Sequence, residues 1–583
     1  MKTRMKATMT AAVALVCLAA AGALAADFEI CIDPKVKPIK DMRQTGCNSG
    51  MGFNAALEAS WGVSDNDYWF VSNKVYTSRM LREAGANLLR LQGMRSWWNR
   101  GKPNPHDPNS KDPKEVRRYK NYRQSNPKVT FDFYKANGIK VWVCLECWST
   151  NDVDNCVEIV QWLVDNDYKS VVAGIEMGNE SYGRAPVPPW VEFIHRAEKI
   201  WPQLPLGINI AELFELNPDL AHMKARLERQ DPLSRDGYFS ASGYVQKSTQ
   251  FVKELAASNV LGKIGHIIWH AYGCEEPYSC SYWGMKRFRD YCAMYPELLK
   301  DKKWWLTEVR PRSDEDNHSQ RLYRDMLIMA HYALMALCQP EVDGFGHHQL
   351  TALSGALYLS NGRNWHVQWY DSNQVSIPDY RAGYDLPRLE VGHMGVMYRI
   401  FSEAIRSNPL FLMHGTSKEA NTEDTFYTSG RVATQVYAYR KACKERMPDR
   451  SQPEGETEYV VATDGRGRYC LLMVNTKPVK QTVRVTMRGR QFAAPMYRMI
   501  TCPERYLDCR AVPGESPMWR QGAWEDSQTG FATWSNWDAH EENGRCRYTR
   551  LPSGVEPKCD DMFIEIEPHT VQSVEFYTRE AKH

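Results

Sequence analysis

The sequence predicts an α/β protein in which a (β/α)8 TIM barrel is followed by a C-terminal antiparallel β-sandwich domain. Between about residues 46 and 405, short apolar runs alternate with amphipathic stretches whose apolar residues recur at helical spacing. From Asn408 onward the long amphipathic stretches disappear. Short runs of alternating apolar and polar residues, separated by turn residues, replace them, which is typical of an antiparallel sheet.

Eight apolar runs in the first part have the length of buried strands. They cover residues 46–56, 86–93, 139–147, 171–180, 204–210, 264–272, 303–309 and 341–350. Helices are expected between them, at 76–85, 129–138, 155–166, 190–201, 242–258 and 320–338. Eight strands that alternate with helices favour a closed parallel barrel over an open sheet. The longest loops, 94–128, 272–283 and 351–389, follow strands and should therefore line the active face.

The second part contains short strand-like runs at 434–440, 458–464, 468–475, 481–487, 562–568 and 572–577. We therefore expect a barrel domain over 26–407 and a β-sandwich domain over 408–583. The segment 504–558 is rich in Trp, Gly, Pro and charge, and its pattern assigns it no fold.

The first 25 residues have the features of a secretory signal peptide. A basic start is followed by a short apolar stretch and by Ala23-Leu24-Ala25, and we expect cleavage after Ala25. The predicted location is secreted or periplasmic. The apolar stretch is shorter than the ~20 residues of a membrane span, and no later segment qualifies as one.

Charge and cysteine content narrow the classes of partner. Of 73 basic and 70 acidic residues, the signal peptide removes three basic ones, which leaves 70 of each sign. This balance argues against a nucleic-acid partner.

In an oxidising compartment disulfides are expected, and Cys274 and Cys280 are the candidate pair. Cys144 and Cys147 lack a second pair that would complete a zinc site.

Two glutamates stand where an apolar run meets a loop. Glu180 ends "VVAGIEMGNE", and Glu308 lies near the end of "KKWWLTEV". Because the carboxyl ends of parallel strands share one face of a barrel, the two side chains should converge. Strand alternation places Glu180 on the same face as Glu176, and Glu308 on the same face as Leu306. Two carboxylates at one barrel mouth are typical of glycoside hydrolysis.

Polar residues on neighbouring strands can support the two glutamates. His270 and Tyr272 are two apart on one strand and can face one pocket, and Asn179 lies at the rim. Arg90 can reach inward to an acid. For Glu176 the expected role is structural, as the partner of Arg43, Arg90 or Arg95 inside the barrel. His347 and His348 resemble a metal pair, but adjacent strand residues point to opposite faces, so no metal site is expected.

Tryptophans on the active-face loops can supply the apolar surface that stacks on a sugar ring. The candidates for substrate binding are Trp148, Trp283 and Trp365. Packing between loops is the alternative role for such residues.

Four short motifs together resemble the clan A glycoside hydrolases. They are "LLRLQG" for the second-strand arginine, "IEMGNE" for the fourth strand, "HAY" for the sixth-strand His-x-Tyr and "WWLTEV" for the seventh-strand nucleophile. The chain departs from the pattern at Ser181, where many members have proline, and in "GFGHHQL", which lacks the tryptophan that often ends the eighth strand. The individual family and the substrate therefore stay open.

The resemblance implies a role for each matching residue. Glu180 would be the general acid and base, Glu308 the nucleophile, and Asn179 a donor to the sugar 2-hydroxyl. Tyr272 and Arg90 would keep the nucleophile ionised. Burial and the neighbouring negative charge would raise the pKa of Glu180, as its role as an acid requires.

The predicted function is that of a secreted retaining glycoside hydrolase, which cleaves oligo- or polysaccharides by double displacement without a cofactor or metal. The alternative is a non-catalytic carbohydrate-binding protein on a glycosidase-like barrel. The sequence contains no G-x-S-x-G, no H-E-x-x-H and no P-loop, which argues against esterase, zinc protease and nucleotide-dependent chemistry.

Overall fold

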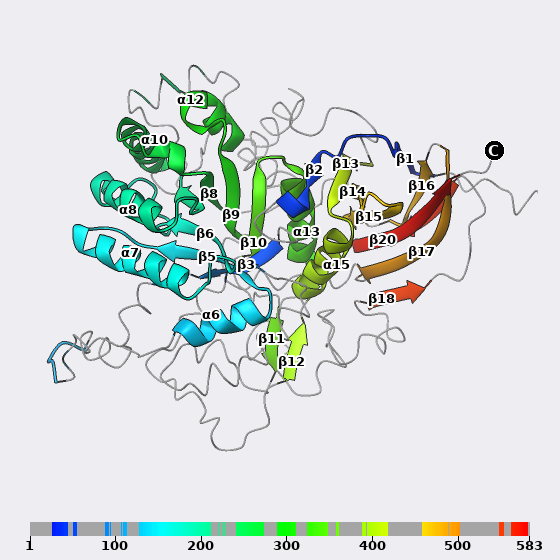
Figure 1. The fold of residues 1–583 in the computed structure, drawn as a ribbon. Coiled ribbons are helices and arrows are strands. Elements are labelled where there is room, and N and C mark those ends of the chain that lie inside the picture. Colours follow the sequence, from blue (N-terminus) through cyan, green and yellow to red (C-terminus); the bar gives the residue numbers. More distant parts are fainter. Residues whose placement is uncertain are drawn as a thin grey trace, which may run out of the picture.

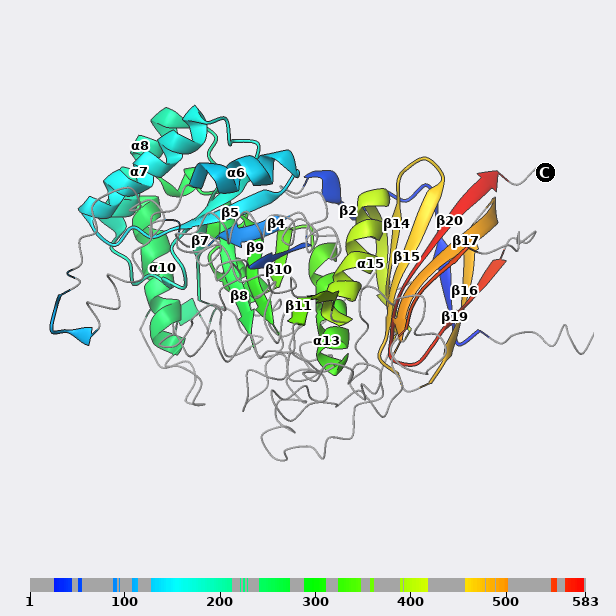
Figure 2. The same ribbon diagram turned by 90° about the horizontal axis from the view of Figure 1, so that it is seen from below.

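The structure is a computed structural model that contains a barrel and a sandwich (Figures 1 and 2). It describes residues 26–44, 51–54, 88–91, 94, 107, 109–113, 127–211, 221, 224–225, 228, 241–272, 288–310, 323–347, 357–360, 388–391, 393–417, 457–477, 479–487, 489–501, 547–552 and 561–580. The predicted signal peptide, residues 1–25, and the expected pair Cys274 and Cys280 lie outside the described residues.

Eight parallel strands close into a barrel in chain order, which confirms the predicted fold. They are β3 (Met51–Asn54), β4 (Leu88–Leu91), β5 (Lys140–Leu145), β6 (Val172–Met177), β7 (Leu206–Asn209), β8 (His266–Tyr272), β9 (Lys303–Arg310) and β10 (Val342–His347). Each strand falls in one of the eight apolar runs, and β9 alone extends one residue beyond its run. Runs buried on both faces are what a parallel barrel requires of its strands.

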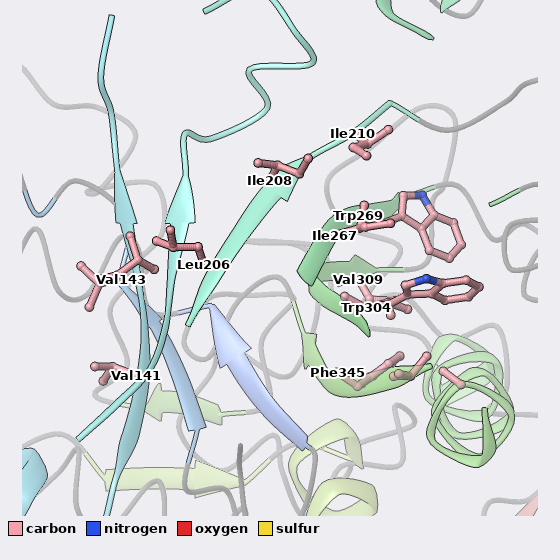
Figure 3. Close-up of a cluster of buried hydrophobic side chains, with 14 of the residues drawn as sticks. Val141, Val143, Leu206, Ile208, Ile210, Ile267, Trp269, Trp304, Val309 and Phe345 are labelled. Carbon is pink, nitrogen blue, oxygen red and sulfur yellow. The ribbon is translucent and has the colours of Figure 1, made fainter. Parts of the chain in front are cut away.

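Helices cover the outside of the barrel. They are α6 (Pro127–Ala136), α7 (Thr150–Asp165), α8 (Val187–Ile200), α10 (Ala241–Ala257), α12 (Pro296–Leu299), α13 (Tyr323–Cys338) and α15 (His393–Ser407), with short 3-10 turns η1 (Met42–Gln44) and η2 (Leu261–Lys263). Outward-facing strand residues such as Trp269 and Trp304 form the core beneath them (Figure 3). The ring of Phe288 stacks on Trp269 at 5.1 Å and meets Trp304 edge-on at 4.9 Å. Within the described segments no helix has the length and apolarity that a bilayer crossing would need.

The inside of the barrel is apolar at depth. Leu88, Trp142, Ile268 and Trp305 form one buried cluster there. Gly207 leaves room for the Trp305 ring, because a Cβ at Gly207 would lie 2.7 Å from that ring. This packed plug closes the interior below the mouth.

Two residues further along the strands, the interior becomes polar. Leu88 is followed at this spacing by Arg90, Trp142 by Cys144, and Ile268 by His270, and these three polar side chains are all buried. Because side chains on one face of a strand recur every two residues, a layer of more polar side chains lies directly above the apolar plug.

Two further sheets pack face to face to form the predicted sandwich. The larger has the order β18-β17-β20-β15-β14-β13-β2 and the smaller β1-β16-β19. Their strands are β13 (Leu410–Thr416), β14 (Thr457–Thr463), β15 (Arg468–Asn475), β16 (Gln481–Met487), β17 (Arg490–Thr501), β18 (Arg547–Pro552), β19 (Asp561–Ile566) and β20 (Thr570–Glu580), together with β1 and β2. A separate two-stranded sheet consists of β11 (Leu357–Ser360) and β12 (Arg388–Val391). Side chains from both sheets, such as Val483, Ile564, Leu471 and Phe576, share one core.

The N-terminal segment belongs to these sheets. The predicted barrel domain begins at residue 26, but β1 (Phe28–Ile32) pairs in parallel with β16, and β2 (Lys40–Asp41) pairs with β13. The apolar residues of β1 alternate and enter the sandwich core. A five-residue alternation identifies a half-buried strand but does not say which sheet receives it, because that choice depends on the tertiary contacts.

Helices α13 and α15 lie between the barrel and the larger sheet (Figures 1 and 2). A buried group of ionisable side chains crosses this contact. Glu458 on β14 meets Nδ1 of His331 on α13, and its other oxygen lies 2.5 Å from Nε2 of His414 on β13. We call Glu458, His331 and His414 the interface cluster.

Candidate active site

The carboxyl ends of the barrel strands bring Glu180 and Glu308 together. One carboxylate oxygen of each, and a ring nitrogen of His270, all lie within 4.8 Å of one another. Glu308 is 4% exposed, whereas Glu180 is half-buried and reaches the mouth from the rim. The site therefore contains one enclosed and one more accessible carboxylate.

Glu308 enters the barrel through an irregularity in β9. The register between β8 and β9 shifts between Trp269 and His270, so that His270 pairs with Glu308. The expectation that Glu308 shares a face with Leu306 was wrong, because Leu306 lies in the outer core while Glu308 and Thr307 both contact interior side chains. A bulge places two successive residues on one side of a strand, which strict alternation cannot do.

Glu180 is held in a left-handed turn just beyond β6. Gly178 has a φ of 91°, and Glu180 itself has a φ of 46°, which is uncommon for a residue with a side chain. Arg184 stabilises the turn, since its Nη2 donates to the Glu180 carbonyl at 2.5 Å and its Nε to the Ser181 carbonyl at 3.2 Å. Such local strain persists only where surrounding contacts enforce it, and it clusters at functional sites.

His270 lies between the two glutamates. Its Nδ1 is 3.2 Å from Oε1 of Glu180 and 3.6 Å from Oε2 of Glu308. On the other side of the ring, Nε2 is 3.1 Å from the Thr307 hydroxyl. The imidazole side chain is fully buried, so these contacts fix its orientation against both carboxylates.

Arg90 organises the other side of Glu308. Its Nε donates to Glu176 at 2.8 Å and its Nη2 to Glu176 at 2.7 Å, while Nη1 contacts Glu308. Nη2 also donates to Oδ1 of Asn179 at 2.8 Å, which leaves the Asn179 amide nitrogen to act as a donor elsewhere. Burial opposes the charge of Arg90, but Glu176 and Glu308 outweigh burial and raise the pKa of the guanidinium above its ordinary value.

The pKa of Glu180 lies below its ordinary value. The hydrogen bond from His270 is the main cause, and it outweighs burial and the charge of Glu308, which both act in the opposite direction. The expectation of a raised pKa was therefore wrong for the unliganded protein. It counted burial and the neighbouring carboxylate correctly but omitted the imidazole contact.

The remaining predicted site residues are placed as follows. Trp148 follows β5 and is 39% exposed, and its backbone N–H donates to Asp152 at 2.9 Å. Tyr272 ends β8, but its side chain, like Trp283 and Trp365, lies outside what the structure describes. His347 is fully buried and lies beside Tyr398, with ring centroids 5.9 Å apart.

Sequence reasoning missed Thr307. Thr307 was overlooked because strand alternation admits only one of two neighbours to the interior, and only the register shift of β9 admits both. Glu176 was expected to pair with one of three arginines, and the structure selects Arg90. The signal for Glu176 was an acid four residues before another acid on a buried run.

The cluster of Glu180, His270 and Glu308 has the ligand types of a divalent metal site. However, Nη1 of Arg90 contacts Glu308, so a metal ion bound there would lie close to a buried positive charge. The nearby guanidinium thus disfavours a metal ion as the partner of these carboxylates. Cys144 and Cys147 are both buried and carry free thiols.

Comparison with known proteins reveals the fold. No protein-family model and no curated protein sequence matches the chain. Among solved structures, the family 51 α-L-arabinofuranosidase AbfB from Bifidobacterium longum aligns over 95% of this chain and 100% of its own, with 10% identity and a TM-score of 0.55.

Two further structures align to a similar extent. The α-L-arabinofuranosidase from Thermotoga maritima covers 94% of this chain and 99% of its own, with 11% identity and a TM-score of 0.53. The family 51 enzyme from Thermotoga petrophila has the same coverage and identity, with a TM-score of 0.52. At such low identity these similarities establish a shared barrel and sandwich, and the chemistry has to be argued from the site.

Proposed function

We propose that this protein is a retaining glycoside hydrolase. The observation that carries the proposal is the approach of Glu180 and Glu308 across one barrel mouth, with carboxylate oxygens within 4.8 Å. Retaining enzymes hold their two carboxyl groups roughly 5–5.5 Å apart, whereas inverting enzymes need about 6.5–9.5 Å to admit a water molecule. The observed spacing supports the shorter geometry.

The reaction follows from the two environments. The Glu308 carboxylate, enclosed and held by Arg90, attacks the anomeric carbon and forms a glycosyl ester. Glu180, more accessible at the rim, donates its proton to the departing glycosidic oxygen. In the second step the Glu180 carboxylate takes a proton from water, the water oxygen attacks the anomeric carbon, and Glu308 is released.

The charge on Glu308 differs between these two steps, and it affects the pKa of Glu180. While Glu308 is ionised, it raises the pKa of Glu180 and favours the acid form. Once Glu308 is esterified that charge is gone, and the His270 contact then favours the Glu180 carboxylate, which is the form a general base needs. The lowered pKa in the unliganded protein is thus compatible with a group that alternates between acid and base.

Two side chains are suited to holding the sugar. Because Arg90 occupies the oxygen of the Asn179 amide, the amide nitrogen can donate to the sugar 2-hydroxyl. Trp148 offers a partly exposed ring next to the mouth, on which a sugar face can stack. We propose oligo- or polysaccharides as substrates and, since the similar structures are named as α-L-arabinofuranosidases, α-L-arabinofuranosides as the first to try.

The test is hydrolysis by the purified protein of a panel of aryl glycosides and polysaccharides, with the anomer of the first product read by NMR. We expect retention of configuration, and an inverted product would refute the mechanism. Glu180→Gln and Glu308→Gln should each lose activity, general acid–base catalysis alone contributing about 10²–10⁴-fold. Sugar binding without turnover by the wild type would favour the carbohydrate-binding alternative.

Export is a separate part of the proposal. It depends on the signal-like residues 1–25, and N-terminal sequencing of the protein recovered outside the cytoplasm would test it. A chain that still begins at Met1 after expression in its own host would contradict cleavage after Ala25.

A further inference from the structure

The inference concerns Glu176, a second acid inside the barrel that the proposed reaction does not use. Glu176 and Arg90 have fully buried side chains, and they meet in a two-point contact through Nε and Nη2 of the guanidinium. Glu308 contacts Nη1 of the same group. Arg90 therefore directs two of its nitrogens to an acid that the proposed reaction does not use, and one to Glu308.

The charge balance of the reaction shows what this arrangement achieves. Before the attack, the buried group holds one positive charge, on Arg90, and two negative charges, on Glu176 and Glu308. Formation of the glycosyl ester neutralises Glu308. If Glu308 were the partner of Arg90 by itself, the ester would leave a guanidinium buried without a counterion. A buried charge that loses its partner is strongly destabilised, so the intermediate would be disfavoured.

We propose that Glu176 is a positioning residue of the reaction: it keeps Arg90 neutralised throughout the cycle, so that Glu308 can give up its charge to the sugar. This inference rests on the proposed function. The Arg90–Glu176 pair stays neutral whether Glu308 is a carboxylate or an ester. Arg90 can thus hold Glu308 and Asn179 in place both before and after Glu308 gives up its charge.

The other groups around Glu308 do not substitute for Glu176. Cys144 on β5 is buried beside Arg90, and burial raises the pKa of its thiol well above the usual value, so it carries no negative charge. His270 on β8 supplies no anion. The Glu180 carboxylate contacts His270 and Tyr182 at the rim. Among the described residues that face Arg90, Glu176 is the carboxylate that takes no part in the bond changes of the proposed reaction.

The main test compares Glu176→Gln with Glu176→Asp. The glutamine variant removes the charge at nearly constant shape, and kcat/KM on an activated aryl glycoside should fall by at least about 100-fold, the cost of a buried unpaired charge. The acid limb of the kcat/KM pH profile should move to lower pH in this variant, because Glu176 no longer offsets the charge of Arg90 at Glu308. The aspartate variant keeps the charge, and its acid limb should stay at the wild-type position. An unshifted acid limb in Glu176→Gln, or an equal shift in both variants, would overturn the proposal.

A double variant provides a second test in case Glu176→Gln by itself fails to fold. Arg90→Gln combined with Glu176→Gln removes both charges and leaves no unpaired guanidinium. The losses of activity should therefore be less than additive, and strictly additive losses would contradict the neutral-pair role. Glu575→Gln is the matched control, because Glu575 is likewise a buried partner of an arginine, Arg468 at 2.6 Å, but lies in the sandwich. It should leave the pH profile unchanged.

A measurement without substrate separates this inference from the proposed function. In protein labelled with ¹³C at the glutamate side-chain carboxyl carbon, the Glu308 signal is identified by its absence in Glu308→Gln. Its titration should move to lower pH in Glu176→Gln and not in Glu176→Asp. If the wild type hydrolyses no glycoside, the proposed function fails, and this titration still decides whether Glu176 controls the charge that reaches Glu308.

Discussion

Replacing Glu458 by glutamine should weaken the contact between the barrel and the larger sheet. Glu458 is fully buried and meets His331 of α13 and His414 of β13 at once. Removing one member of a buried charge pair typically costs about 3–5 kcal/mol, since the partner loses its counter-charge. We expect a loss of this size in the free energy of unfolding of Glu458→Gln at pH 7, measured by urea denaturation.

The loss should depend on pH in a defined direction. Burial opposes ionisation of Glu458, but the two histidines outweigh it, and the pKa of Glu458 lies below its ordinary value of 4.5. A carboxyl with a lowered folded-state pKa contributes stability above its unfolded pKa, and this contribution disappears as the pH falls through the folded pKa. The difference between Glu458→Gln and the wild type should therefore be full above pH 4.5 and shrink below it.

The control for this experiment is Glu565→Gln. Glu565 pairs with Lys480 at 2.5 Å, but both side chains are about half exposed, and exposed pairs contribute roughly 0–1 kcal/mol. The reasoning would be refuted if Glu458→Gln cost no more than this control at pH 7. A deficit that stayed constant on acidification would refute the ionised state of Glu458.

Three further predictions concern the barrel. His270→Leu should move the basic limb of the kcat/KM profile to higher pH, because the contact that lowers the pKa of Glu180 is removed while burial still raises it; an unmoved limb would contradict this. Thr307→Val should slow catalysis about 10-fold or more by removing the hydroxyl that holds the buried imidazole of His270, whereas Thr307→Ser should keep the wild-type rate. Gly207→Ala should lower the free energy of unfolding by about 1–3 kcal/mol, because its Cβ would lie 2.7 Å from a buried tryptophan ring, while Gly262→Ala, with open space around it, should change it by less than about 0.5 kcal/mol.

The fold could be predicted largely from the periodicity of apolar residues. Runs such as 139–147 and 303–309 are apolar on both faces, which identifies strands covered by helices on one side and barrel interior on the other. The same reading found α13 from its long apolar pattern. It identified neither β1 nor β2 and placed their residues in the barrel domain, because a short strand pairs with whichever sheet edge the folded chain presents to it.

The residues of the candidate site could be predicted more readily than their arrangement in space. Glu180, Glu308, Arg90, Asn179 and His270 were found from their positions at strand ends, and the structure places all five in one network. The direction of the Glu180 pKa could not be found in this way. It depends on an imidazole ninety positions away whose distance is unknown before the chain folds.

The sequence by itself determined which segments form the strands of the barrel, which residues carry ionisable groups at their ends, and that those ends meet on one face. Only the tertiary structure decided that the register of β9 shifts so that Glu308 and Thr307 both turn inward, and that Arg90 is shared between Glu176 and Glu308. The physical reason is that burial leaves a periodic mark in the sequence. Register and the choice among partners arise from contacts between strands that are far apart in the chain.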